Sequence, residues 1–159
     1  MLSIVKLLTI LSVFAFGFSS IDLRSARDRI KKTINDKEPG WQMTEDKLFA
    51  GSETEGVLSI KWEQNNKSVD ALIMAGDSKQ AAIKHYHGVR KHRSFGDIEM
   101  KIQDKPCTLA KGKCFVWVDV NFKRRGVAFV RGQVFGIVDS EDGSTAKRFA
   151  DEIAGVLSP

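Results

Sequence analysis

Residues 114–122 and 126–138 read CFVWVDVNF and GVAFVRGQVFGIV, and only Lys123, Arg124 and Arg125 separate them. Both stretches are rich in β-branched and aromatic residues, which favour β-strands. We therefore expect two long strands, joined by a basic turn. The sheet to which these strands belong decides the fold class.

Three further strands are indicated by alternation or by a return of the chain. Apolar and polar residues alternate in VLSIKWE (57–63) and in IEMKIQ (98–103), the period of a half-buried strand. After the polar segment QNNKS, the stretch VDALIMA (69–75) runs back, so 57–63 and 69–75 should form a hairpin. Clean alternation predicts that one face of the sheet is in contact with water.

Apolar residues spaced three and four apart predict three amphipathic helices. The first covers 21–36, with Asp22 as its cap and Pro39-Gly40 after its end. The second begins near Asp77-Ser78 and reaches Val89, and the third covers 144–157, with Ser144 as its cap. Residues 41–56 contain no clear period and are expected to be irregular.

The resulting order is α-β-β-α-β-β-β-α. It predicts an α+β fold, a mainly antiparallel five-stranded sheet with the amphipathic helices packed on one face. The β-α-β stretch across the second helix leaves one parallel pairing open. No repeat or linker divides the chain after its first residues.

The N-terminal stretch MLSIVKLLTILSVFAFGFSS is typical of a secretory signal peptide. One cation, Lys6, precedes an apolar run that is shorter than the ~20 residues of a membrane-spanning helix. An uncleaved anchor or a buried N-terminal helix is the alternative. We expect a signal peptide at 1–19, one α+β domain at 20–159, no transmembrane span after cleavage, and a secreted or periplasmic location.

The charge of the mature chain is mildly basic. Removing Lys6 from the 25 Lys and Arg leaves 24 cations against 20 carboxylates, an excess of +4. That excess is too small for a nucleic-acid-binding tail. The three tryptophans are explained by core strands, so no row of exposed aromatics indicates nucleic acid as a partner.

Two cysteines, Cys107 and Cys114, flank the segment TLAKGK. Outside the cytoplasm, such a pair most often forms a disulfide. Half of a metal site is the alternative, but zinc ligands favour closer cysteine spacing, and the redox motif Cys-x-x-Cys is absent. We predict a structural Cys107–Cys114 bond.

The segment KHYHGVRKHR, residues 84–93, contains all three histidines of the chain. On a helix, His85 and His87 point about 200° apart, and His92 lies two turns beyond His85. This spacing does not gather metal ligands, so we expect no metal and no cofactor. The cations indicate either a solvated helix end, with Gly88 as its C-terminal cap, or an anion-binding surface. The candidate anion-binding residues are Lys84, Arg90, Lys91, Arg93, Lys123, Arg124 and Arg125.

No catalytic constellation is visible beside these histidines, and the cysteines are expected to be oxidised. The expected function is therefore that of an exported, non-enzymatic domain. It would bind a ligand or partner at the cell envelope or outside the cell, such as an anionic polymer or lipid surface. The rival is a carboxylate-based hydrolase with a pocket near Asp119, assisted by Glu141. Asp119 otherwise belongs to the solvent face of its strand.

The signal peptide leads to a first prediction. Protein purified from its native host should begin between Phe18 and Ile21 when its N-terminus is sequenced, because cleavage after Gly17 or Ser19 fits the small-residue rule. An intact Met1 on the soluble protein would contradict the prediction.

Overall fold

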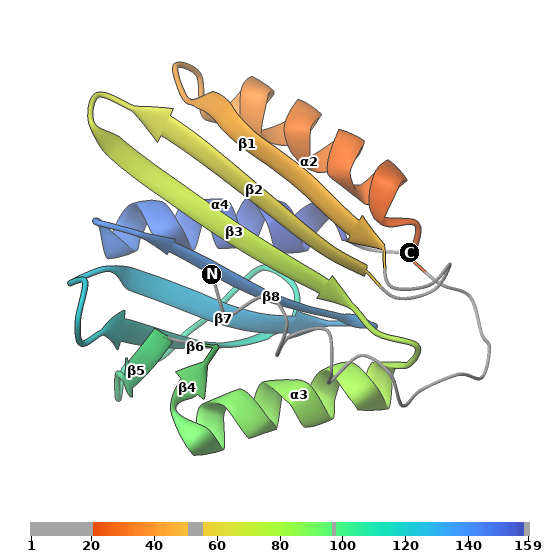
Figure 1. The fold of residues 1–159 in the computed structure, drawn as a ribbon, viewed down its shortest axis with the longest axis vertical. Helices are drawn as coiled ribbons and strands as arrows, with labels where there is room; N and C mark the ends of the chain where they lie inside the picture. The colour runs from red at the N-terminus through yellow and green to blue at the C-terminus, as the bar shows by residue number, and fades with distance from the viewer. Residues whose placement is uncertain (1–20, 51–55, 97, 158–159) are drawn as a thin grey trace.

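The computed structural model describes residues 21–50, 56–96 and 98–157 (Figure 1). In chain order the elements are α2 (Leu23–Lys37), β1 (Gln42–Ala50), β2 (Gly56–Gln64), β3 (Lys67–Ala75), α3 (Lys79–His92), β4 (Ser94–Phe95), β5 (Ile98–Ile102), β6 (Lys113–Asp119), β7 (Arg125–Arg131), β8 (Val134–Ser140) and α4 (Gly143–Val156). The expected signal peptide lies outside the described residues. None of the described helices is long and apolar enough to cross a membrane.

The strands form one curled, half-barrel sheet of eight strands in the order β1-β2-β3-β8-β7-β6-β5-β4. The predicted five-stranded sheet is therefore wrong, although the mixed α+β content is confirmed. Every pair of neighbours is antiparallel, so the parallel pairing that the sequence left open does not occur. Instead, α3 precedes the small edge strands, and β8 returns to pair with β3.

The sequence predicts one strand over 126–138, but the chain turns back at Gly132 and forms the β7–β8 hairpin. Gly132 has a φ of +55°, a conformation that glycine adopts without steric cost. Both strands are buried on both faces along most of their length. Apolar residues therefore lie on both sides of the short polar segment Arg131-Gly132-Gln133, and the two strands look like one long strand in the sequence.

Strand β1 occupies part of the region that the sequence predicts to be irregular. Its register against β2 shifts between Met43 and Glu45, so its residues do not keep a regular alternation. Asp46 then lies opposite the buried Ile60 and pairs with Lys31 of α2 at 3.0 Å. A bulge and an ion-paired carboxylate thus hide this strand from the sequence pattern.

Local patterns predicted several other elements correctly. The β2–β3 hairpin is confirmed, and its turn residues Asn65 and Asn66 have φ values of 50° and 62°, as a type I′ turn requires. The first helix is confirmed with Asp22 as its cap, since the Asp22 carboxylate accepts a hydrogen bond from the Arg24 amide. The last helix is confirmed too, but Asp142 caps it rather than a serine.

The helices cover both faces of the sheet, so the prediction that they lie on one face is wrong. Helices α2 and α4 pack on each other and, with strands β2, β3, β7 and β8, enclose the larger core. Helix α3 packs on β7 and β8 from the opposite side, over a second core that includes Tyr86, Phe115 and Trp117. Figure 1 shows α3 apart from α2 and α4.

Strand β7 supplies side chains to both cores in alternation. Val127 and Phe129 belong to the core under α2 and α4, whereas Ala128 and Val130 belong to the core under α3. Since successive strand residues point to opposite faces, this alternation requires an apolar residue at every position. The continuous apolar run in the sequence is the consequence.

Two glycines in the centre of the sheet face aromatic rings across the strand pair. Gly126 is opposite Trp117, and Gly136 is opposite Phe129. A Cβ on Gly126 would lie 2.2 Å from the Trp117 ring, and one on Gly136 would lie 2.3 Å from the Phe129 ring. The rings fill the space that side chains would need, an arrangement that stabilises glycines in curved sheets.

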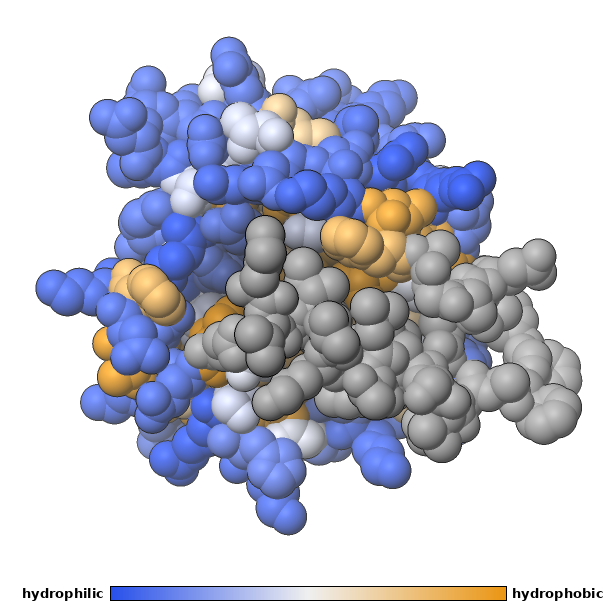
Figure 2. All heavy atoms as spheres, in the orientation of Figure 1, coloured by the Kyte–Doolittle hydropathy of each residue, from blue (hydrophilic) through white to orange (hydrophobic). Residues whose placement is uncertain are grey.

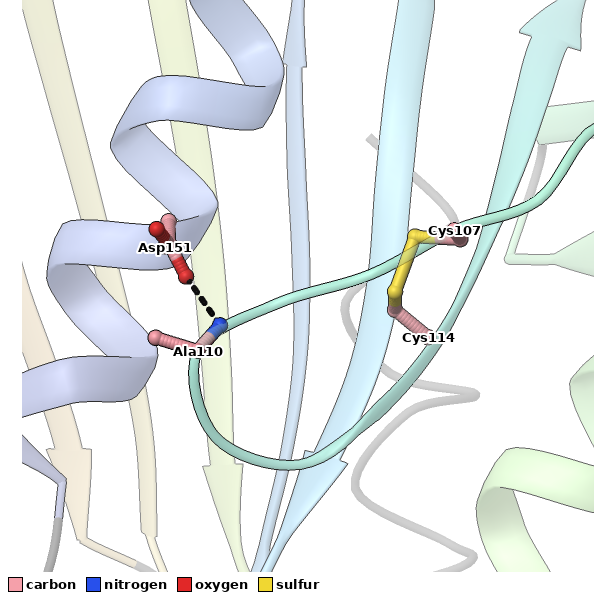
Figure 3. The surroundings of a disulfide bond; sticks show 4 residues. All are labelled: Cys107, Ala110, Cys114 and Asp151. Carbon is pink, nitrogen blue, oxygen red and sulfur yellow. Dashed lines mark hydrogen bonds between the residues drawn. A yellow bond between two sulfur atoms is a disulfide. The ribbon is translucent and has the colours of Figure 1, made fainter.

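The two cysteines predicted to pair lie at disulfide distance, with an Sγ–Sγ separation of 2.07 Å (Figure 3). The loop that they close reaches α4, where the Ala110 amide donates a hydrogen bond of 2.7 Å to the Asp151 carboxylate. Leu109 is buried in the larger core. The disulfide loop therefore connects the start of β6 to α4.

Replacing Gly126 with alanine should destabilise the protein by about 1–3 kcal/mol, because the new methyl group overlaps the fully buried Trp117 ring. Urea unfolding followed by tryptophan fluorescence would measure this loss. The matched control is Gly155→Ala in α4, where a Cβ meets nothing within 4 Å. There we expect a gain of about 0.5–1 kcal/mol. Equal stability of the two variants would contradict the proposed packing.

Candidate functional site

The first cationic stretch predicted to bind anions lies in the second half of α3, with Arg90, Lys91 and Arg93 at the C-terminal end and Lys84 near the middle of the helix. Lys84, Arg90, Lys91 and Arg93 are all exposed. The helix passes through Gly88 and ends at Arg93, whose φ of 55° is left-handed, so Gly88 is not the cap. The last turn places its cations at the negative end of the helix dipole, where positive charge is stabilising.

The second stretch, in the β6–β7 turn, lies at the same end of the sheet. The Met100 amide donates to the Arg93 carbonyl at 2.8 Å, and Met100 is opposite Asp119 in the β5–β6 pair. The Asp119 amide in turn donates to the Arg124 carbonyl at 2.8 Å. Neighbouring strands are about 4.8 Å apart, so about 15 Å separates the two stretches. Figure 1 shows the end of α3 and the β6–β7 turn at the same side of the molecule.

Lys84 lies near the middle of α3, and Arg125 packs beside Gly143 at the start of α4, on the face of the sheet opposite α3. The other four exposed cations form what we call the basic surface: Arg90, Lys91, Arg93 and Lys123. None of them forms an ion pair with a carboxylate in the described part of the chain. Their charges are available to an anionic ligand.

Arg124, the seventh cation, points into the protein. Its Nε donates to the Asp139 carboxylate, and its Nη1 donates to the Ser68 hydroxyl at 2.8 Å and to Glu141 at 2.9 Å. Its Nη2 donates to Asp70 at 2.6 Å and to the Asp139 carbonyl at 3.1 Å. A guanidinium has five N–H donors, and these acceptors use all five. Arg124 thus has no donor left for a ligand and does not belong to the basic surface.

Burial and ion pairing shift the pKa values of the groups in this network in opposite directions. Burial disfavours the charge of Arg124, but Asp139, Asp70 and Glu141 outweigh burial and raise its pKa above the usual value. Burial raises the pKa of Asp139 to about 6, although Arg124 acts in the opposite direction. Burial likewise raises the pKa of Asp70. The network links β3 and β8 to the β6–β7 turn.

Asp119, the carboxylate proposed for the rival hydrolase, shapes the β6–β7 turn. It is 4 % exposed, so the expectation that it lies on the solvent face is wrong. One carboxylate oxygen accepts hydrogen bonds from the amides of Asn121 at 2.7 Å and Phe122 at 3.1 Å. Glu141 is hydrogen-bonded to the Ser68 amide at 2.9 Å. Both carboxylates therefore have structural partners, and Asp139, which lies near them, was not identified from the sequence.

The three histidines lie in different environments. His87 and His92 are exposed, whereas His85 lies against the rings of Phe95 and Phe135, with centroids 6.0 Å and 4.8 Å away. Burial lowers the pKa of His85, and its Nε2 has no hydrogen-bond partner among the described residues. His85 is thus half-buried against aromatic rings and does not belong to an exposed histidine cluster. Within the described ranges, no three His, Cys, Asp or Glu side chains are grouped as metal ligands.

Two exposed apolar residues of the β6–β7 turn were not expected from the sequence. Val120 and Phe122 are 55 % and 73 % exposed. The sequence places both in a long strand over 114–122, but β6 ends at Asp119. The signal that could have located the turn is Asp119 itself, since aspartate often accepts hydrogen bonds from backbone amides two and three residues further on.

The sequence matches no protein-family model. It also matches no curated protein. Among solved structures, a crystal structure described as a GTP binding regulator from Thermotoga maritima is similar over 82 % of this chain and 85 % of that one, with 16 % identity and a TM-score of 0.47. Similarity of this degree establishes neither a shared fold nor a shared ligand.

Replacing Arg124 with methionine should destabilise the protein by about 3–5 kcal/mol at pH 8, because Asp139 would keep a buried charge without its partner. The folded-state pKa of Asp139 already exceeds the unfolded value, so its ionisation lowers stability as the pH rises through about 6. Without Arg124 that pKa should rise further. The loss should therefore be smaller at pH 5, where Asp139 is protonated, and urea unfolding at both pH values would measure it.

The double variant Arg124→Met with Asp139→Asn is the control for this prediction. It removes the buried charge together with its partner, so it should recover much of the stability lost at pH 8. A loss for Arg124→Met that is independent of pH and unrelieved by Asp139→Asn would contradict this account of the network.

Proposed function

We propose that this protein is an exported, non-enzymatic domain that binds polyanions at the cell envelope or outside the cell. The basic surface is the binding site. The observation that carries the proposal is that four exposed cations, Arg90, Lys91, Arg93 and Lys123, lie at one end of the sheet and are unpaired with any described carboxylate. The disulfide supports the oxidising compartment that the N-terminal sequence predicts.

The arrangement of the basic surface suits an extended, multiply charged ligand. Its cations come from two separate elements, the end of α3 and the β6–β7 turn, so they are spread over a distance that one small anion does not span. Exposed Lys and Arg side chains attract such a ligand through long-range electrostatics. Salt screens that attraction, with a Debye length of about 8 Å at 0.15 M ionic strength. Binding should therefore be steeply salt-dependent.

Retention on immobilised heparin, a soluble polyanion of high charge density, tests the proposal. The mature chain should elute at a higher salt concentration than the variant Lys91→Glu with Lys123→Glu, which reverses one charge in each stretch. The matched control reverses Arg24 and Arg29 to glutamate. Both are exposed on α2, on the opposite face of the sheet, and their reversal changes the net charge by the same amount.

We expect the control variant to elute close to the wild type, because its substitutions lie far from the basic surface. Thermal unfolding of all three proteins would establish that each is folded. Equal losses of retention in the two variants would mean that only net charge matters, and would overturn the basic surface as a site. Weak retention of the wild type would overturn polyanion binding altogether.

A further inference from the structure

The β6–β7 turn combines exposed apolar side chains with the basic surface. Phe122 is 73 % exposed and Val120 is 55 % exposed, and they are only two residues apart. Lys123 follows directly, and it belongs to the basic surface. In Figure 2, hydrophobic residues lie among hydrophilic ones at the edge where Figure 1 places the β6–β7 turn. An apolar tip beside cations is the composition of segments that enter the interface of anionic membranes.

The turn is held in this exposed conformation by specific bonds. The Asp119 carboxylate accepts from the Asn121 and Phe122 amides, and the Asp119 amide donates to the Arg124 carbonyl. Arg124 is itself anchored to β3 and β8 through Asp70 and Asp139. The apolar pair is therefore presented by a rigid turn, so binding would require little ordering of the chain.

We propose that residues 120–123 insert into the headgroup region of an anionic lipid bilayer, while the basic surface lies on the charged headgroups. This inference rests on the proposed function, since the same cations supply the electrostatic attraction. It goes further by naming the ligand as a lipid surface. A hydrated polymer offers no apolar phase, so Val120 and Phe122 would add nothing to its binding, whereas a bilayer removes both side chains from water.

One described carboxylate opposes this orientation. Glu99 is exposed, and its carbonyl accepts a hydrogen bond of 3.2 Å from the Val120 amide. Its negative charge therefore lies close to the turn and to the bilayer. Glu99→Gln should strengthen binding to anionic vesicles, because it removes this repulsion without changing the size of the side chain.

The experiment is cosedimentation of the mature chain with phosphatidylcholine vesicles, with and without phosphatidylglycerol. We expect binding only to the anionic vesicles. The variant Val120→Ser with Phe122→Ser should bind them about tenfold more weakly or worse, because two apolar groups no longer leave water. Its retention on heparin should equal that of the wild type, since no charge has changed.

Phe49→Ser is the matched control. Phe49 is 51 % exposed, but it lies in the strand register at the other end of the sheet, opposite Val57, whereas the β6–β7 turn lies beyond Gly126. Removing this exposed ring should leave vesicle binding unchanged. An equal loss for Phe49→Ser would overturn the inference, because it would show that apolar surface in general, and not this turn, drives binding.

A spectroscopic variant gives a direct reading of insertion. Trp41, Trp62 and Trp117 are buried, so tryptophan introduced as Phe122→Trp reports on the turn. Its emission should shift to the blue on anionic vesicles and should be quenched by lipids labelled in the upper acyl chain. Unshifted emission, or full vesicle binding by the double serine variant, would overturn insertion. If heparin retention still depended on Lys91 and Lys123, the proposed function would stand; loss of both properties would overturn both.

Discussion

The burial of β7 and β8 on both faces is the constraint on which the rest of the structure depends. The two strands lie between α2 and α4 on one side and α3 on the other, so their residues alternate between two cores. A strand in this position cannot carry a polar side chain along its length without a partner, because the desolvation of an unpaired polar group is costly. Their apolar sequence, the two glycines opposite aromatic rings and the division of the helices between faces all follow from this burial.

The Arg124 network lies at the end of the sheet, beyond the apolar parts of β7 and β8. Asp139 is near the end of β8, and it is 9 % exposed, so its carboxylate needs a cation at short range. Arg124 reaches it from the β6–β7 turn and also contacts Ser68 and Asp70 of β3. One side chain thus joins β3 and β8 to the β6–β7 turn and fixes the base of that turn. A buried charge pair is not by itself strong evidence of stability, but it makes this geometry specific, since each partner left alone would be a buried charge.

Patterns within one segment predicted a large part of this fold. The apolar faces of α2 and α4, the β2–β3 hairpin and the cysteine pair all depend on neighbours in sequence, and each is confirmed. The errors arose where the partner is distant. The β7–β8 turn was missed because both cores demand apolar residues before Arg131 and after Gln133, so the two strands looked like one. Strand β1 was hidden by its bulge and by Asp46. Likewise, the alternation in β2 and β5 predicted a water-exposed face, and the helices were therefore assigned to the other face. That alternation carries no information about β3, β8, β7 and β6, which lie between these two strands in the sheet.

The same limit applies to the candidate site, as the three cations of the β6–β7 turn show. In the sequence, Lys123, Arg124 and Arg125 are equivalent, and all three were assigned to one anion-binding surface. In the structure, Lys123 and Arg125 are exposed, while the five N–H groups of Arg124 are directed at Ser68, Asp70, Asp139 and Glu141. Three of those four partners are carboxylates: Asp70 in β3, Asp139 in β8 and Glu141 just after β8. All of them are distant from residue 124 in the sequence, so no local pattern identifies them.

This division of roles within one turn has a physical consequence for binding. Neutralised by its carboxylates, Arg124 adds little to the attraction of an anion, yet it holds the neighbouring cations and the exposed Phe122 in place. Because a rigid turn loses little conformational freedom when a ligand binds, the energy of contact is retained as affinity. The charge available to a ligand thus depends on which carboxylates reach each cation in the folded chain. A count of lysines and arginines in KHYHGVRKHR or in the β6–β7 turn does not determine that charge.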